Sequence, residues 1–185
     1  MNTTEIECRF IGIDKEKLVK KLLELGAVDK GEKLLDEVMF YDQDLKWRID
    51  QRFIRIRKAG DVVTISYKEH QNHTVDGTYE IELHVDDFEK SQLLFQKIGL
   101  RLFRRQQKLR HTFILGEATF DIDTWPKIPP YVEIEGSSED ILKEAADKVG
   151  FDWKDANFHN ASWIIENIYN TPVRDLIWFT FDRQE

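Results

Sequence analysis

Alternation of apolar and polar residues runs through much of the chain and predicts β-strands with one dry and one wet face. The pattern is clear in Glu80-Ile81-Glu82-Leu83 and again in Asp121-Ile122-Asp123. Glycine-containing turns at Ala59-Gly60-Asp61 and Leu115-Gly116-Glu117 join neighbouring strands and favour antiparallel hairpins. We expect eight strands, at roughly residues 3–11, 36–42, 52–58, 61–68, 78–86, 107–115, 117–123 and 131–136.

Helical periodicity marks four segments between or after these strands. Three of them begin at a capping side chain and end at a glycine: from Asp14 to Gly26, from Asp86 or Asp87 to Gly99, and from Ser137 or Ser138 to Gly150. The fourth covers about 161–169 and stops before Pro172. We expect loops at 42–51, 69–78 and 125–130.

Eight antiparallel strands are enough to close a barrel, whose interior admits side chains or one small ligand. We therefore predict an α+β fold, a mostly antiparallel eight-stranded β-barrel with helices packed around its outside. A chain of 185 residues can bury a sizeable core in one domain. We expect a single domain over 1–185, with the barrel at about 3–150. Trp163, Trp178 and Phe179 suggest that a C-terminal helical segment, 151–185, packs on the barrel.

Composition narrows the classes of protein. The chain carries 27 Lys and Arg against 35 Asp and Glu, a net charge of −8, which argues against a general nucleic-acid binder. A single cysteine, Cys8, excludes a disulfide framework and a cysteine-rich zinc site. The first residues lack a signal-peptide pattern, and no run of 18 apolar residues occurs. We expect a cytoplasmic monomer or homodimer, with no membrane and no nucleic-acid partner.

Charges of one sign recur two residues apart on the wet faces of the strands. Such pairs lie roughly 7 Å apart and repel by about 2 kcal/mol at an effective dielectric constant of 20. For one strand, a charged face in water is a sufficient explanation. Six such pairs together favour one cation-binding and one anion-binding region. The acidic pairs are Glu5/Glu7, Glu80/Glu82, Asp121/Asp123 and Glu133/Glu135, and the basic pairs are Arg55/Arg57 and Lys108/Arg110.

An ionic face that points inward would give the barrel a charged tunnel, with helices covering the apolar outer face. Carboxylate oxygens suit Mg²⁺ or Mn²⁺, and Arg and Lys suit a polyphosphate. Phosphoryl chemistry needs both kinds of group, because charge develops on the transferring and leaving oxygens.

The ordered set of motifs resembles the CYTH family, also called triphosphate tunnel metalloenzymes. The resemblance covers Glu5 to about Gly150, and the stretch from Thr124-Trp125-Pro126 to Glu133 is most similar to the branch of class IV adenylate cyclases. The family also includes thiamine triphosphatases and inorganic triphosphatases, which use a divalent metal in an eight-stranded tunnel. The motifs are Glu5-x-Glu7-x-Arg9, Arg55-Ile56-Arg57, Lys68, Glu80-x-Glu82, Lys108-x-Arg110, Asp121-x-Asp123 and Glu133-Ile134-Glu135-Gly136.

The resemblance implies roles for these residues. Metal ligands would be Glu5, Glu7 and Glu133, with Glu135, Asp121 and Asp123 as further candidates. The triphosphate would be held by Arg9, Arg55, Arg57, Lys68, Lys108 and Arg110. Glu80 and Glu82 would orient basic side chains or bind a second metal, and candidates for a direct catalytic part are Arg9, Glu80, Glu82 and Tyr41.

Two positions depart from the family pattern. Arg9 stands where the family usually has lysine, which keeps the positive charge but not a titrating amine. Met39 occupies the position of a tyrosine found in some relatives, and Tyr41 follows on the same face. The second departure makes a tyrosine-dependent thiamine triphosphatase mechanism less favoured.

The resemblance implies a Mg²⁺- or Mn²⁺-dependent enzyme that cleaves a phosphoanhydride bond in ATP, tripolyphosphate or thiamine triphosphate. In a cyclase the ribose 3′-hydroxyl attacks the α-phosphorus and releases pyrophosphate, whereas in a triphosphatase water attacks a terminal phosphorus. Tunnel charge serves both reactions, and the branch resemblance tips the expectation slightly towards the cyclase. A binding module without catalysis is a third hypothesis, kept open by Arg9.

Overall fold

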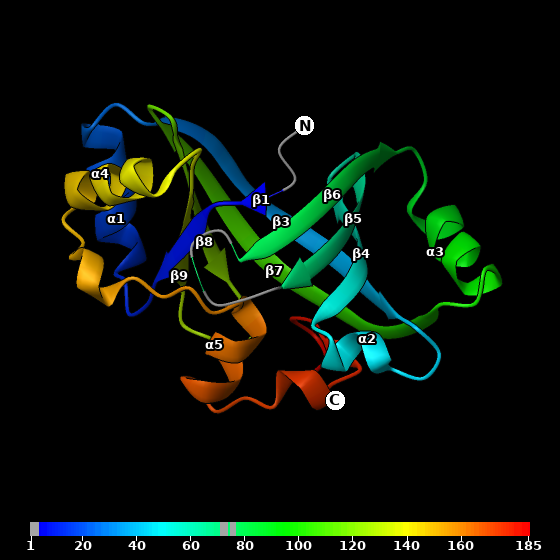
Figure 1. The fold of residues 1–185 in the computed structure, drawn as a ribbon. Helices are drawn as coiled ribbons and strands as arrows, with labels where there is room; N and C mark the ends of the chain where they lie inside the picture. Colours follow the sequence, from blue (N-terminus) through cyan, green and yellow to red (C-terminus); the bar gives the residue numbers. More distant parts are fainter. Residues whose placement is uncertain (1–3, 71–73, 75–76) are drawn as a thin grey trace.

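The protein folds around one strongly curved sheet, seen in the computed structural model, which describes residues 4–70, 74 and 77–185 (Figure 1). Along the sheet the strand order is β1-β6-β5-β4-β3-β7-β8-β9-β2, and all these neighbours run antiparallel. The prediction of a mostly antiparallel barrel with outer helices is thus confirmed. The strands are β1 (Thr4–Glu5), β2 (Glu7–Phe10), β3 (Val28–Tyr41), β4 (Arg52–Ala59), β5 (Val62–His70), β6 (Thr78–Val85), β7 (Arg101–Leu115), β8 (Ala118–Thr124), β9 (Tyr131–Glu135) and β10 (Trp178–Phe179).

The N-terminal strand nearly closes the barrel, because its two halves pair with opposite edges of the sheet. Glu5 in β1 lies opposite Thr78 in β6, whereas Glu7 in β2 lies opposite Glu135 in β9. Ile6 lies between the two halves, and its carbonyl accepts a hydrogen bond from Gly136 N at 3.1 Å. The expected single strand over 3–11 is therefore divided in two.

Three further expectations need correction. The strand expected at 36–42 begins at Val28, because 28–35 extend a long ribbon with β7 whose side chains are mostly exposed and do not alternate. β7 begins at Arg101 instead of 107, and a register shift at Met39/Phe40 interrupts its pairing with β3. The loop expected over 42–51 contains a short helix, α2 (Lys46–Ile49). β10, which pairs parallel to β7, was not expected from the sequence.

Helices cover the apolar outer face of the barrel. α1 (Lys15–Glu24) and α4 (Glu139–Val149) pack over β2, β8 and β9, with Leu22 and Leu142 buried against Cys8, Phe120 and Ile134. α3 (Phe88–Lys97) covers another part, where Phe88 packs in a cluster with buried residues of β3 and β4. This places the charged faces of the strands inside the barrel.

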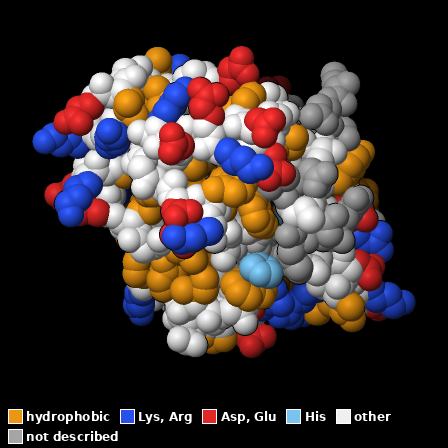
Figure 2. Space-filling view, turned by 60° about the vertical axis from the view of Figure 1, so that its left-hand side comes forward, with side chains coloured by type: hydrophobic (Ala, Val, Ile, Leu, Met, Phe, Trp, Pro, Cys, Tyr) orange, Lys and Arg blue, Asp and Glu red, His pale blue; other side chains and the backbone are white. Residues whose placement is uncertain are grey.

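Capping side chains start these helices as expected. Asp14 Oδ1 accepts from Lys17 N at 3.1 Å, Asp87 Oδ1 from Lys90 N at 2.8 Å, and Ser138 Oγ from Ile141 N at 3.3 Å. On the side of the molecule that carries α1 and α4, basic and acidic side chains are interspersed (Figure 2). Among the described residues, none of the helices has the length and apolar character needed to cross a membrane.

The C-terminal segment packs against the end of the barrel beside β8 and β9. α5 (Ala161–Asn167) contributes Ile165 to a buried cluster with Trp125, Tyr131, Val173 and Phe179. Trp125 Nε1 donates to the Tyr131 hydroxyl at 2.9 Å inside this cluster. Two 3₁₀ turns, Trp153–Asp155 and Val173–Asp175, complete the segment. The chain after β9 therefore contributes a wall at this end of the barrel interior.

Candidate functional site

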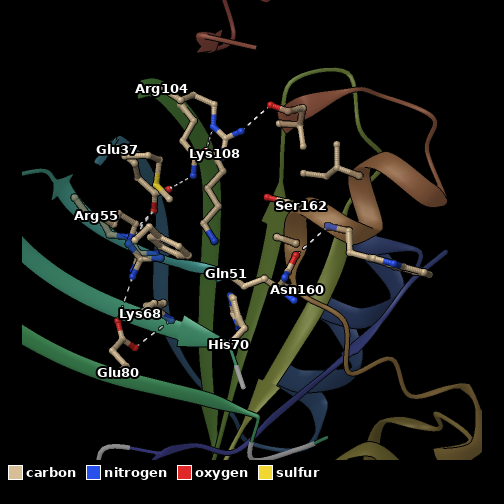
Figure 3. A pocket seen from close by; sticks show the side chains of 18 of the residues that line it. Glu37, Gln51, Arg55, Lys68, His70, Glu80, Arg104, Lys108, Asn160 and Ser162 are labelled. Carbon is tan, nitrogen blue, oxygen red and sulfur yellow. Dashed lines mark hydrogen bonds and ion pairs between the residues drawn. The ribbon is translucent and has the colours of Figure 1, made fainter. Parts of the chain in front are cut away.

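The barrel interior contains a cavity of about 610 Å³, lined by charged side chains from the strands (Figure 3). Alternate residues of a strand point to the same face, so the expected charged pairs enter the cavity together. Asp121 and Asp123 do not line it. The predicted site residues that do are Glu5, Glu7, Arg9, Tyr41, Arg55, Arg57, Lys68, Glu80, Glu82, Lys108, Arg110, Glu133 and Glu135.

One group of basic side chains surrounds Glu37, which was not among the predicted site residues. Glu37 is 1% exposed and accepts from Arg57 Nε at 2.7 Å and from Gln106 Nε2 at 2.6 Å. Arg55 Nε lies 3.9 Å from the same carboxylate. Burial would raise the pKa of Glu37, but Arg57 and Arg55 hold it well below its usual range. Glu37 thus fixes two arginines in the cavity wall as an ionised partner.

A second group joins β1, β5 and β6 around Lys68. Its Nζ donates to Glu5 Oε1 at 2.7 Å and lies 3.0 Å from Glu80 Oε2. Burial raises the pKa of Glu5 to about 8, although Lys68 opposes this. Burial would also raise the pKa of Glu80, but its hydrogen bonds, Lys68 and Arg55 lower it to about 2. The neighbouring Glu82 accepts from Ser66 Oγ at 2.8 Å, so these β6 carboxylates hold other side chains in place.

The third group explains where Asp121 and Asp123 lie. Asp123 is fully buried and accepts from Lys108 Nζ at 2.6 Å and from Arg110 Nε at 2.7 Å. Asp121 pairs with Arg110 Nη1 and accepts from Thr112 Oγ1. Burial, together with Arg110, lowers the pKa of Lys108 to about 8 despite Asp123. Both aspartates therefore hold Lys108 or Arg110 in position, and neither aspartate faces the cavity.

Arg9 links the acidic strands to the C-terminal segment. Its Nη2 lies 2.9 Å from Glu7 Oε2 and 2.6 Å from Glu133 Oε2, and its Nη1 donates to the His159 carbonyl at 3.0 Å. Its backbone also exchanges hydrogen bonds with Asn157, at 2.8 and 2.9 Å. Burial would lower the pKa of Arg9, but Glu133 and Glu7 raise it well above its ordinary value. Arg9 thus neutralises Glu7 and Glu133 and also connects β2 to the C-terminal segment.

Carboxylate oxygens at the acidic end have the chemistry that a divalent cation needs. Burial, followed by Glu133 and Glu7, raises the pKa of Glu135 to about 7, and Glu7 contributes in the same direction to Glu5. This crowding of carboxylates would be relieved by a cation. Within the described part of the chain, however, no three His, Cys, Asp or Glu side chains are already gathered as a metal site. Glu7 and Glu133 would have to turn from Arg9, and Glu5 from Lys68, to bind one.

Among the polar or charged residues that β3 and β7 contribute to the cavity wall, Glu37, Arg104 and Gln106 were not predicted. Arg104 and Gln106 continue the alternation of Lys108 and Arg110 towards the start of β7, which was the available signal. Met39 and Tyr41 both line the cavity, in agreement with their expected common face. The strand sequences carried no signal for Asn160 and Ser162, which α5 and its cap bring to the wall from a distant part of the chain (Figure 3).

Comparison with known proteins identifies a family and a relative that are similar in sequence to this chain. The family model that describes the CYTH domain matches residues 3–156. A Methanocaldococcus jannaschii protein, provisionally named an adenylate cyclase, is 27% identical over 146 residues, which are 78% of this chain and 82% of the relative.

Two solved structures share the fold at low sequence identity. A Vibrio parahaemolyticus protein, also provisionally named an adenylate cyclase, superposes with a TM-score of 0.75 at 11% identity, covering 90% of this chain and 99% of that one. A Hippeastrum protein, an adenylyl cyclase candidate described as having a dominant triphosphatase activity, gives a TM-score of 0.63 at 12% identity over 90% and 95% of the two chains.

Proposed function

The chain belongs to the CYTH family, and we propose that it binds a triphosphate together with a divalent cation and cleaves a phosphoanhydride bond. The observation that carries the proposal is the cavity itself, in which Arg55, Arg57, Lys68, Lys108 and Arg110 face carboxylates of β1, β2 and β9. A triphosphate needs several cations at short range, and guanidinium groups can bind phosphoryl oxygens in a bidentate manner.

The wall of the cavity is suited to stabilising charge on phosphoryl oxygens. Glu37 holds Arg57, and Asp123 holds Lys108 and Arg110, so these cations are fixed before a ligand arrives. Preorganised charges in a site that excludes water stabilise developing charge without reorganisation. Glu80 and Glu82 orient Lys68, Arg55 and Ser66 in this account, rather than binding a second metal.

A divalent cation, Mg²⁺ or Mn²⁺, would be held by Glu5, Glu7, Glu133 and Glu135. When bound, it would supply positive charge that stabilises negatively charged phosphoryl oxygens. Arg9 currently neutralises Glu7 and Glu133, so it would release them to the cation and remain near the ligand as a phosphate-binding group. We leave Asp121 and Asp123 out of the metal set because they lie behind Arg110 and Lys108.

The reaction is either cyclisation of ATP, with release of pyrophosphate, or hydrolysis of a triphosphate. The name of the Methanocaldococcus jannaschii relative favours the cyclase, and the activity described for the Hippeastrum protein favours the hydrolase. We lean slightly towards the cyclase, because the Methanocaldococcus jannaschii protein is similar in sequence, at 27% identity, whereas the Hippeastrum protein shares the fold at only 12% identity.

Phosphorus-31 NMR of ATP and of tripolyphosphate, each with protein and Mg²⁺ or Mn²⁺, tests the proposal. Pyrophosphate and cyclic AMP from ATP would establish the cyclase, and orthophosphate from either substrate would establish the triphosphatase. Whichever products form, EDTA should prevent their formation, and so should Arg57→Ala. Lys58→Ala should retain activity, because it removes an exposed side chain of the same strand. Intact substrates under all conditions would contradict an enzymatic role.

A further inference from the structure

Lys108 is one of the proposed phosphate-binding cations, and two side chains hold its ammonium group. Its Nζ donates to Asp123 Oδ2 at 2.6 Å and lies over the ring of Trp125, 5.1 Å from the ring centre. A cation within about 6 Å of an indole is attracted to the electron-rich face of the ring. Lys108 and Trp125 are each 5% exposed and both line the barrel cavity, so little water screens this attraction.

The ring supports the charge of Lys108 without occupying its hydrogen-bond donors. Burial, together with Arg110, lowers the pKa of Lys108 to about 8, so the charged amine depends on its surroundings. Asp123 does not serve Lys108 alone, because it also accepts from Arg110 Nε at 2.7 Å. Among the described residues, Asp123 accepts the one hydrogen bond that the ammonium of Lys108 donates, and an ammonium has three donors. Two donors therefore remain for phosphoryl oxygens, and an aromatic face does not compete for them.

The sheet places Trp125 beside Lys108, at the point where the neighbour of β7 changes. β8 pairs with β7 as far as Leu109, which lies opposite Thr124, and Trp125 is the next residue along the chain. On the other side of Lys108, β10 pairs with β7 at Phe179, two residues before Lys108. Lys108 therefore lies in the short interval between these two pairings, and Trp125 leaves β8 directly beside it.

Two contacts fix the orientation of the Trp125 ring. Its Nε1 donates to the hydroxyl of Tyr131 at 2.9 Å, and the ring is stacked on Phe179, with 5.8 Å between the ring centres and 16° between the planes. Tyr131 and Phe179 are both buried, so the ring cannot turn without losing these contacts. Phe179 lies outside the region matched by the family model, 3–156. One of the two contacts therefore comes from the C-terminal segment.

We propose that Trp125 is a positioning residue for the triphosphate: the face of its indole holds the ammonium of Lys108 towards the phosphoryl oxygens, and β10 holds the indole. This inference rests on the proposed function, in which Lys108 binds the triphosphate. Trp125 also packs in a buried cluster with Ile128, Ile165 and Val173, so loss of its ring lowers stability in any case. The effect on ligand binding, and its dependence on Lys108, distinguish positioning from packing alone.

A double-mutant cycle on tripolyphosphate binding tests whether Trp125 acts through Lys108. Dissociation constants are measured by calorimetry with Mn²⁺ for wild-type protein, Trp125→Leu, Lys108→Met and the double variant. Trp125→Leu should weaken binding at least fivefold in the wild-type background and less than twofold in the Lys108→Met background. Equal weakening in both backgrounds, or no weakening of wild-type binding, would overturn the inference.

Two further variants separate positioning from stability. Trp125→Phe keeps an aromatic face but loses the hydrogen bond to Tyr131, so it should lower the melting temperature yet bind tripolyphosphate within threefold of wild type. Ile128→Ala is a matched control, because Ile128 belongs to the same buried cluster but not to the cavity lining, and it should lower only the melting temperature. If Trp125→Phe weakened binding as much as Trp125→Leu, the aromatic face would not be what positions Lys108.

Phe179→Leu keeps the inference testable if Trp125→Leu does not fold. It removes the stacked ring of β10 but keeps an apolar side chain, and it should weaken tripolyphosphate binding at least twofold, again only where Lys108 is present. Unchanged binding, or weakening that does not depend on Lys108, would overturn the inference alone. Failure of wild-type protein to bind tripolyphosphate would overturn the proposed function, and the inference with it.

Discussion

The guanidinium of Arg9 lies 2.6 Å from the carboxylate of Glu133, and both side chains are nearly buried in the barrel. The same arginine contacts Glu7 and the carbonyl of His159. Arg9 therefore contacts both the carboxylates that are proposed to bind a cation and the C-terminal segment. A lysine could supply the charge but not this set of contacts, because its three donors converge on one nitrogen.

Arg9→Ala should lower the free energy of unfolding by about 3–5 kcal/mol, because removing one partner leaves buried carboxylates without a counter-charge. Mg²⁺ or Mn²⁺ should restore more stability to this variant than to the wild type, since the cation replaces the lost charge. Urea denaturation with and without metal measures both effects. Arg9→Lys is the control, and its free energy of unfolding should fall by less than that of Arg9→Ala. Equal stability of the two variants would show that the charge at this position is not what matters.

Glu37→Gln should cost about 3 kcal/mol of stability at neutral pH, because Arg57 and Arg55 lose an ionised buried partner. The folded-state pKa of Glu37 is depressed, so its contribution is present above its unfolded pKa, near 4.5, and is lost as pH falls below that value. The difference in the free energy of unfolding between wild type and Glu37→Gln, measured by urea denaturation at several pH values, should therefore shrink in acid. Asp36→Asn, a half-exposed carboxylate of the same strand, should change stability by no more than about 0.5 kcal/mol.

The strands and most of the charged lining could be predicted because their information is local. Arg55 and Arg57, or Glu80 and Glu82, alternate with apolar residues that the outer helices cover, so pattern alone places them on one face. Glu37 stands on such a face as well, within a strand that was predicted, but as a lone charge it formed no pair with a neighbour of the same sign.

The parts that were missed depend on distant contacts. Arg104 and Gln106 precede the expected start of their strand, and the register shift at Met39/Phe40 breaks the pairing there. Asp121 and Asp123 have the same local pattern as the cavity carboxylates, and only the positions of Arg110 and Lys108 separate their roles. The contribution of 160–173 to the cavity depends on where the C-terminal segment packs, and no local periodicity encodes that.

Lys108 should make triphosphate binding weaken as pH rises through about 8, its lowered pKa, because the deprotonated amine no longer attracts phosphoryl oxygens. Titration of tripolyphosphate between pH 6.5 and 9.5 measures this, in wild type and in Lys108→Arg. The ionisation of the ligand is common to both proteins, so the difference between them isolates Lys108. The arginine variant should lose the alkaline decline, and identical profiles would remove Lys108 from the phosphate contacts.

Glu7→Gln and Asp123→Asn should separate metal binding from support of the cations. Glu7→Gln should raise the Mn²⁺ concentration needed for half-maximal activity at least tenfold with the fold intact, since one carboxylate ligand is lost. Asp123→Asn should instead destabilise the protein, because Lys108 and Arg110 lose a fully buried partner, and it should leave the metal requirement unchanged. Metal titrations of activity, with melting curves on the same samples, check both. The reverse pattern would place the metal at Asp123.

Calorimetric titration of tripolyphosphate into the protein, with and without Mn²⁺, shows whether the barrel cavity is a triphosphate site. We predict one site per chain, tighter binding in the presence of Mn²⁺, and at least tenfold weaker binding in Arg57→Ala but not in Lys58→Ala. Absence of binding, or binding that Arg57→Ala and Lys58→Ala affect alike, would contradict this prediction.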